Sequence, residues 1–183
     1  PKLRERDLAA QLGISEAQRV AAHIGHGARA IAAHPDNVMR AAEKLGTVRG
    51  LTRNEHCVIE IDGPYHDYHP GEHAAMVLAP QLALRMFPKH WQHAFAVEKE
   101  TDNGVMRSLQ VFDASGTAIH KVFLRPESNQ KDWDSTVQEI AITGNRALAV
   151  EPAPKPEGAK SAPEKADILR KEWARMTDTQ QFM

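Results

Sequence analysis

The chain has 183 residues, of which 42% are hydrophobic, and its charged side chains sum to a formal net charge of −1. This length and composition fit one folded domain with a sizeable core and appendages, while the near-neutral charge gives no general attraction to nucleic acid or anionic lipid. A single cysteine, Cys57, excludes a disulfide framework within the chain. Because no apolar run reaches membrane-spanning length and no signal peptide is visible, we expect a cytoplasmic protein.

The segment "RERDLAAQLGISEAQRVAAHIG" predicts two short helices joined at Gly13, the second capped by Ser15. Small residues around a turn glycine are also typical of a DNA-binding helix-turn-helix. In that alternative the second helix would offer Gln18, Arg19 and His23 to the duplex, with Glu16 opposing them. We favour the simpler interpretation, a helical hairpin packed on a sheet.

The next segment, "HPDNVMRAAEKLG", predicts a third helix that Asp36 caps and Gly46 ends. Its apolar residues recur with helical spacing and form one buried stripe, made of Val38, Met39, Ala42 and Leu45.

From residue 47 the pattern changes to that of strands. "TVRGLTRNEHCVIEI" predicts two strands about a turn at Asn54-Glu55, and "AAMVLAP" and "LALRMF" predict two more. In residues 91–124, turn signals at Asn103-Gly104 and Ser115-Gly116 separate three strands, which predicts an antiparallel meander. A closing helix follows in "PESNQKDWDSTVQEIAI", with Ser128 as its expected cap and Trp133, Val137 and Ile140 buried.

The proline-rich stretch "EPAPKPEGAKSAP", residues 151–163, predicts an extended linker. After it, "EKADILRKEWARM" predicts one amphipathic helix. The expected fold class is therefore α+β, with an N-terminal domain over residues 1–150, the linker, and a tethered helical segment at residues 164–183.

Three of the ten histidines cluster in "YHDYHPGEH", where His66, His69 and His73 give the spacing H-x2-H-x3-H. A zinc site needs ligands held rigidly in tetrahedral geometry, but prolines and a glycine interrupt this run. We therefore favour a solvated loop, with metal or haem ligation by these histidines as the alternative.

Familiar catalytic signatures are missing from the sequence. The chain has no G-x-S-x-G nucleophile elbow and no glycine-rich phosphate loop. His56 and Cys57 are direct neighbours and, on a strand, would point to opposite faces, so they do not form a catalytic dyad.

Arg85 and Phe87 in "LALRMF" form the most informative pair. Strand alternation places them on one face, opposite Leu84 and Met86. An arginine beside an aromatic ring can hold a planar, anionic ligand. The alternative is an arginine at an exposed face that lies over apolar neighbours.

Five segments occur in an order that resembles one family: "ERDLAAQLGISEAQ", "LGTVRGLTRNEHCVIE", "LALRMFPKHWQHAFAVE", "RSLQVFDASGTAIHKVFL" and "EWARMTDTQQFM". Together they resemble the bacterial cytoplasmic haem-utilisation proteins of the HemS/ChuS/HmuS family. Members of that family consist of two similar halves, each with a large antiparallel sheet and helices, and bind haem between them. The resemblance implies that this chain is the first half, the linker and the first helix of the second half.

The resemblance also implies site residues. Arg85 and Phe87 match an arginine and a phenylalanine that approach the haem, Arg85 as the polar catalytic group and Phe87 against the macrocycle. In "MTDTQQFM", Gln180 occupies the position of the family's axial histidine, and glutamine is a poor iron ligand compared with imidazole. Weaker candidate ligands are His73 and His56.

The family implies intracellular haem binding for iron acquisition, either as haem trafficking or as haem degradation with an external reductant. Haem-import machinery or a haem oxygenase would then be partners, and nucleic acid and membrane would not. The alternatives are a ligand-deficient module of the same fold that forms homodimers, and the DNA-binding regulator described above.

Overall fold

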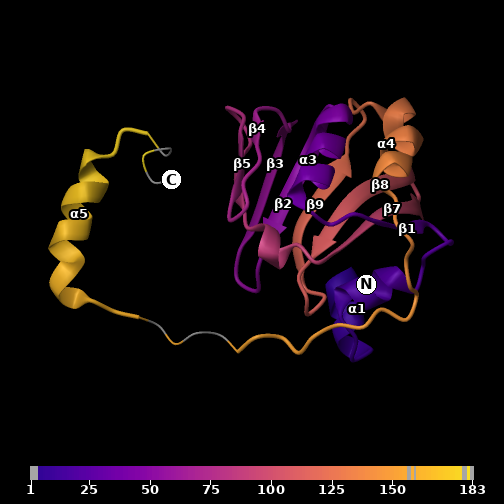
Figure 1. Ribbon diagram of the computed structural model, residues 1–183, viewed down its shortest axis with the longest axis horizontal. Helices are drawn as coiled ribbons and strands as arrows, with labels where there is room; N and C mark the ends of the chain where they lie inside the picture. Colours follow the sequence, from indigo (N-terminus) through magenta and orange to yellow (C-terminus); the bar gives the residue numbers. More distant parts are fainter. Residues whose placement is uncertain (1–3, 156–157, 159, 179–180, 182–183) are drawn as a thin grey trace. The chain divides into compact units, whose positions relative to one another are not determined.

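The computed structural model of the chain describes residues 4–155, 158, 160–178 and 181. The chain divides into two units, residues 1–153 and residues 154–183. Counted over these described residues, the first unit holds two antiparallel sheets and four α-helices, and the second holds one α-helix (Figure 1). The predicted boundaries of the linker, 151 and 163, stay a prediction.

Along the chain of the first unit, the described α-helices come before most of the strands or after the last one, as the sequence predicts. None of the described helices combines the length and apolar character that crossing a membrane requires. The α-helices are α1 (Glu5–Gln11), α2 (Glu16–Ala21), α3 (Pro35–Lys44), α4 (Trp133–Ile140) and α5 (Ala166–Arg175), and the 3-10 turns are η1 (Pro88–His90), η2 (Gln130–Asp132) and η3 (Pro163–Lys165).

The strands form a six-stranded sheet in the order β1-β7-β8-β9-β2-β3 and a three-stranded sheet in the order β4-β5-β6. Every pairing is antiparallel, and β7, β8 and β9 form the expected meander. The strands are β1 (Ala28–Ile31), β2 (Thr47–Arg53), β3 (Val58–Pro64), β4 (Tyr68–His69), β5 (Ala75–Leu78), β6 (Ala83–Met86), β7 (His93–Thr101), β8 (Gly104–Phe112) and β9 (Ala118–Leu124).

The sequence misses two of these strands, β1 and β4. Each is only two to four residues long, so neither shows a clear alternation. β4 lies inside the segment predicted as a loop, and its pairing with β5 is what makes it a strand.

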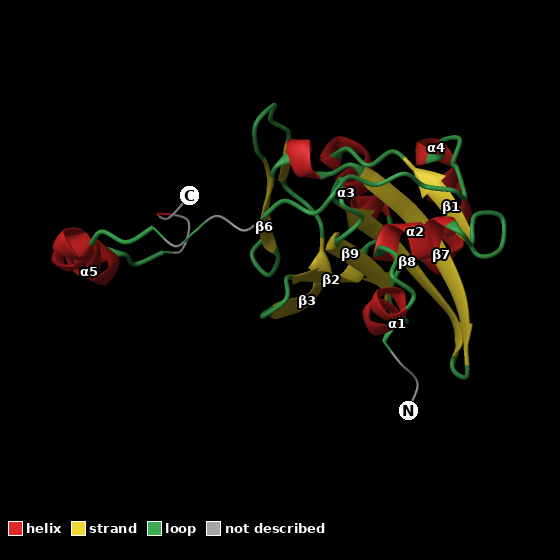
Figure 2. Ribbon diagram, turned by 90° about the horizontal axis from the view of Figure 1, so that it is seen from below, coloured by secondary structure: helices red, strands yellow, loops and turns green. Residues whose placement is uncertain are grey.

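Side chains alternate between the two faces of the large sheet and build two cores. Leu109 and Val111 of β8 join the larger core with α3, α4 and the small sheet. Phe112 packs in a smaller core with Phe95 and with Ala17 of α2. Figure 2 shows the small sheet at one end of the large one, beyond β3.

The N-terminal helices form the predicted hairpin on the sheet. Ala17 and Ala21 of α2 are fully buried, in the smaller core. Two of the three residues proposed to face DNA contact the protein instead, because Gln18 donates to the Leu148 carbonyl and Arg19 pairs with Glu5, while His23 is exposed. This packing is the arrangement that the simpler interpretation predicts.

Ser15 caps α2 as predicted, in a reciprocal capping box with Gln18. Ser15→Ala should therefore lower the free energy of unfolding by about 1 kcal/mol, because the Gln18 amide loses its acceptor at a helix end. Urea denaturation would measure the change. Ser161→Ala, at an exposed residue, should alter stability by less than about 0.5 kcal/mol, and equal losses in both variants would contradict the capping role.

Two predicted caps are wrong. The N-cap of α3 is His34, whose Nδ1 accepts the Asp36 amide at 3.2 Å, with Pro35 as the first helical residue. Proline fits there because it lacks an N–H and its φ is already helical. Ser128 lies before η2, accepts from the Arg125 amide at 2.8 Å and donates to the Thr47 carbonyl, so it ties a loop to β2 instead of capping α4.

Candidate functional site: the outer side of β6

Arg85 and Phe87 lie side by side on the exposed side of β6 and its C-terminal end. The Arg85 guanidinium carbon is 5.7 Å from the centroid of the Phe87 ring, within the range of a cation–π contact. Arg85 is exposed and Phe87 is 45% exposed, whereas Met86 is buried, as alternation predicts. Arg85 forms no ion pair with another described residue, so its donors face solvent.

The residues between and around this pair anchor it to the larger core. Met86 and Leu82 are 2% and 4% exposed and belong to that core. After Phe87, η1 leads to Trp91, which is also buried. The pair is therefore carried on a segment fixed at both ends, which limits the entropy lost when a ligand binds.

Next to Trp91, a buried polar cluster joins strands β2 and β9 to Tyr65, the residue that follows β3. His120 of β9 bonds through Nε2 to the Tyr65 hydroxyl at 2.6 Å and through Nδ1 to the Thr52 hydroxyl at 2.9 Å. Its ring also stacks on Trp91, with centroids 6.0 Å apart. Burial lowers the pKa of His120 to about 4 and raises that of Tyr65, because a charged form has no water around it there.

The histidine segment is exposed and is not assembled into a metal site. His66, His69 and His73 are all exposed, and His69 pairs with Asp67 at 2.9 Å. Asp67 has a φ of 58°, in the left-handed region, as expected of a tight connection. Among the described residues, no three His, Cys, Asp or Glu side chains are grouped closely enough to hold a metal ion.

The remaining predicted residues lie elsewhere. His56 and Cys57 are exposed in the turn between β2 and β3, where both of their amides donate to Asn54 Oδ1. The sequence places them on a strand, and the structure corrects this. Gln180 lies outside the described residues.

The buried cluster of Thr52, Tyr65 and His120 is not predicted from the sequence. Tyr65 is 55 positions from His120 and Thr52 is 68 positions from it, so no local spacing in the sequence indicates the cluster. The available signal is a histidine inside an otherwise apolar strand, "AIHKVFL", which a core position tolerates only when its nitrogens are hydrogen-bonded.

Comparison with known proteins assigns the class. The family model for the haemin-degrading HemS/ChuX domain matches residues 13–140, which covers most of the first unit. The chain therefore belongs to the HemS/ChuX family.

Particular relatives agree with this assignment. The chain is similar to the hemin transport protein HmuS of Yersinia pestis, with 36% identity over 97% of this chain and 51% of that protein. Among solved structures it resembles holo-PhuS, a heme-binding protein from Pseudomonas aeruginosa, with a TM-score of 0.81, 36% identity, and coverage of 98% of this chain and 53% of that one. It also resembles the E. coli heme oxygenase ChuS, with a TM-score of 0.73, 28% identity, and coverage of 97% and 52%. The chain thus spans about half the length of the curated relatives it matches.

Proposed function

We propose that this chain is part of an intracellular haem-binding protein of iron acquisition, and that Arg85 and Phe87 form one wall of its haem site. The observation that carries the proposal is the placement of an exposed arginine beside an exposed aromatic ring on an anchored strand, in a chain of the HemS/ChuX family. The proposal is also supported by relatives that are named as a hemin transport protein, a heme-binding protein and a heme oxygenase.

The two side chains suit haem chemically. A half-exposed phenylalanine ring offers apolar area for a flat macrocycle. The guanidinium of Arg85 offers several N–H donors in a planar fork, which matches a carboxylate or another oxygen-bearing group. Among the described residues no histidine forms a ring contact with Phe87 or a hydrogen bond with Arg85, so the axial ligand would come from elsewhere.

Haem, when bound, supplies the redox and oxygen chemistry of this family, with electrons from an external reductant. The contribution proposed for this chain is binding and orientation by Phe87, and a hydrogen-bond donor at Arg85 as the polar catalytic group. Delivery to a haem oxygenase and receipt from haem-import machinery are the partner relations that the proposal entails.

Haemin titration of the whole chain, followed by the Soret band, tests this site. Arg85→Ala together with Phe87→Ala should weaken haemin binding by about tenfold, because one charged hydrogen-bond donor and one packed ring are lost. Lys89→Ala is the matched control, since it removes an exposed cation four residues from Arg85 and should leave the affinity unchanged.

Two results decide the outcome. Wild-type haemin affinity in the Arg85→Ala, Phe87→Ala double variant would reject the proposed wall. Gln180→His restores an imidazole at the position that resembles the family's axial ligand, and we expect it to tighten binding and sharpen the Soret band.

A further inference from the structure

A cleft of about 590 Å³ lies between helices α1 and α2 and strands β7, β8 and β9. It is on the α2 side of the large sheet, because its floor residue Gln110 alternates with Leu109 and Val111 of the opposite core. The small sheet with Arg85 packs on that opposite core, through Met86. The cleft is therefore separate from the proposed haem wall.

The floor of the cleft follows the register of three adjacent strands. Gln110 of β8 lies directly opposite Lys121 of β9, and two residues along, Ser108 lies opposite both Phe123 and Val97. A further two residues along is Met106. From Gln110 to Met106 the floor spans about 13 Å at the rise of a β-strand.

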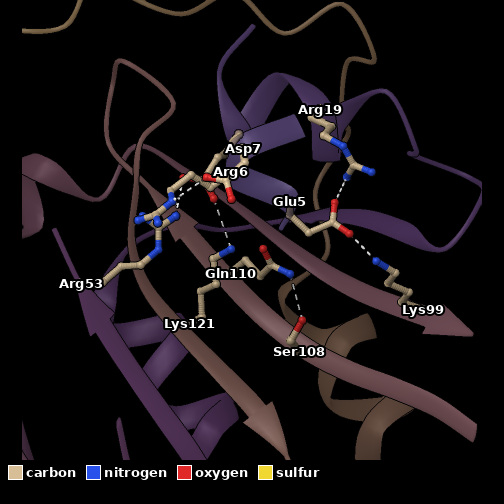
Figure 3. A network of polar contacts seen from close by, with 10 residues as sticks. Glu5, Arg6, Asp7, Arg19, Arg53, Lys99, Ser108, Gln110 and Lys121 are labelled. Atoms are coloured by element: carbon tan, nitrogen blue, oxygen red, sulfur yellow. Dashed lines mark hydrogen bonds and ion pairs between the residues drawn. The ribbon is translucent and has the colours of Figure 1, made fainter. Parts of the chain in front are cut away.

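One end of this floor carries buried charge that is not balanced. Glu16 is shared by Arg53 and Lys121, the latter at 3.5 Å, and all three side chains are only 12% or 13% exposed. Figure 3 shows the two cations, Arg53 and Lys121. One carboxylate and two cations leave an excess of one positive charge. Burial lowers the pKa of Lys121, although the negative charge of Glu16 acts in the opposite direction.

The second group repeats the imbalance, because Glu5 is shared by Arg19 and Lys99 (Figure 3). Of the other two carboxylates at the cleft, Glu98 is paired with Arg107 at 3.1 Å and Glu100 is exposed, so the cations of these groups exceed the carboxylates by one. An anion beside Lys121 would offset the excess charge there.

Gln110 adds an independent polar signal at the same end. The residue is 8% exposed, and its Nε2 donates to Ser108 Oγ at 3.0 Å. Its Oε1 accepts no hydrogen bond from any other residue in the described ranges, although it lines the cleft. A buried amide usually has partners for both ends. The second N–H of Nε2 is therefore available to an anionic group, whereas Oε1 is an acceptor and bonds only to a donor such as water or a hydroxyl.

Apolar side chains form the floor between the two charged groups, while His23 and His26 also line the cleft and Lys99 pairs with Met106 in the sheet register. Met106 is 37% exposed and Val105 is 51% exposed, and Val97 and Phe123 lie between them and the charged end. A cleft with charged groups and an apolar stretch of floor between them suits an amphipathic molecule.

We propose that this cleft binds a small amphipathic anion, with its carboxylate, sulfonate or phosphate group at Lys121 and Gln110 and its apolar body along Val97, Phe123 and Met106. The site is distinct from the haem wall at Arg85 and does not depend on that proposal.

The test uses the whole chain and the probe 8-anilinonaphthalene-1-sulfonate, an amphipathic monoanion whose fluorescence reports binding. Lys121→Met should weaken probe binding by about tenfold, since one charged partner is lost while the length of the side chain is kept. Lys131→Met, at an exposed residue before α4, removes the same charge and should leave the affinity unchanged. Gln110→Leu should also weaken binding, and circular dichroism verifies that each variant is folded.

A neutral analogue separates anion recognition from simple apolar adsorption. N-phenyl-1-naphthylamine has the same apolar body without the sulfonate, so it should bind the wild type and Lys121→Met with equal, lower affinity. Equal binding of the anionic probe to the wild type, Lys121→Met and Gln110→Leu would overturn the proposal. In a parallel haemin titration, the haemin affinity of Lys121→Met should equal that of the wild type. This measurement distinguishes a wrong proposal for the cleft from a wrong proposal for the haem wall at Arg85.

Discussion

Gly50→Ala should lower the free energy of unfolding by about 3 kcal/mol, the upper end of the usual cost of overpacking a core. A Cβ at Gly50 would come within 2.3 Å of the Tyr65 hydroxyl oxygen and 3.3 Å of Leu82 Cδ1. The first distance is shorter than any ordinary contact, so Tyr65 must move. Because that hydroxyl bonds to His120 at 2.6 Å, the movement also leaves a buried nitrogen without its partner.

The adjacent strand of the same hairpin offers a matched control for this substitution. Gly63 of β3 pairs with Val48 of β2, and a Cβ there would meet Gln81 at 3.6 Å, an ordinary van der Waals distance. Gly63→Ala should therefore change stability by less than about 1 kcal/mol, in either direction. Urea denaturation of both variants checks the difference, and equal stabilities would show that the space above Gly50 is not filled as described.

Acid should destabilise the fold through His120 before the carboxylates titrate. Burial lowers the pKa of His120 to about 4 in the folded chain, against 6.5 for an exposed histidine. Between these two values the unfolded chain binds a proton that the folded chain does not, so unfolding is favoured as the pH falls. This linkage should remove about 3 kcal/mol of stability between pH 6.5 and pH 4, and none above that range.

The difference in stability between the wild type and His120→Gln isolates this contribution. The variant loses the titrating group, so its disadvantage at pH 7 should shrink as the pH falls to 4. Carboxyls with lowered pKa values, such as Glu5 and Asp62, titrate identically in both proteins and cancel in the difference. As a control, the stability of His90→Gln, at an exposed residue, should vary with pH in parallel with that of the wild type. If the stability of His120→Gln also runs parallel to that of the wild type, residue 120 does not titrate in this window and the prediction is wrong.

Several features of the fold could be predicted because they depend on short stretches of chain. Ser15 and Gln18 form a capping box within four residues, and the meander follows from two turn signals between alternating strands. The exposure of Arg85 and Phe87 follows from strand alternation about a buried Met86. The family could be recognised because its sequence motifs occur in the same order along this chain, and the match of the family model over residues 13–140 confirms it.

The errors arise where a partner distant in sequence decides between local alternatives. Asp36 is a good N-cap by type, but His34 takes that role, and Asp36 instead accepts a hydrogen bond from Tyr68 in β4. Ser128 likewise bonds to Thr47 of β2. Two-residue β4 exists because β5 supplies its hydrogen-bond partners.

The sequence by itself therefore determined the α+β class, the antiparallel meander, the family and the exposed pair on β6. Only the tertiary structure decided which polar residues meet inside: His120 with Tyr65 and Thr52, and Lys121 with Glu16 and Gln110. The physical reason is that backbone and capping preferences act over a few residues, whereas a buried polar group finds its partner through sheet register. That register joins strands far apart in the chain.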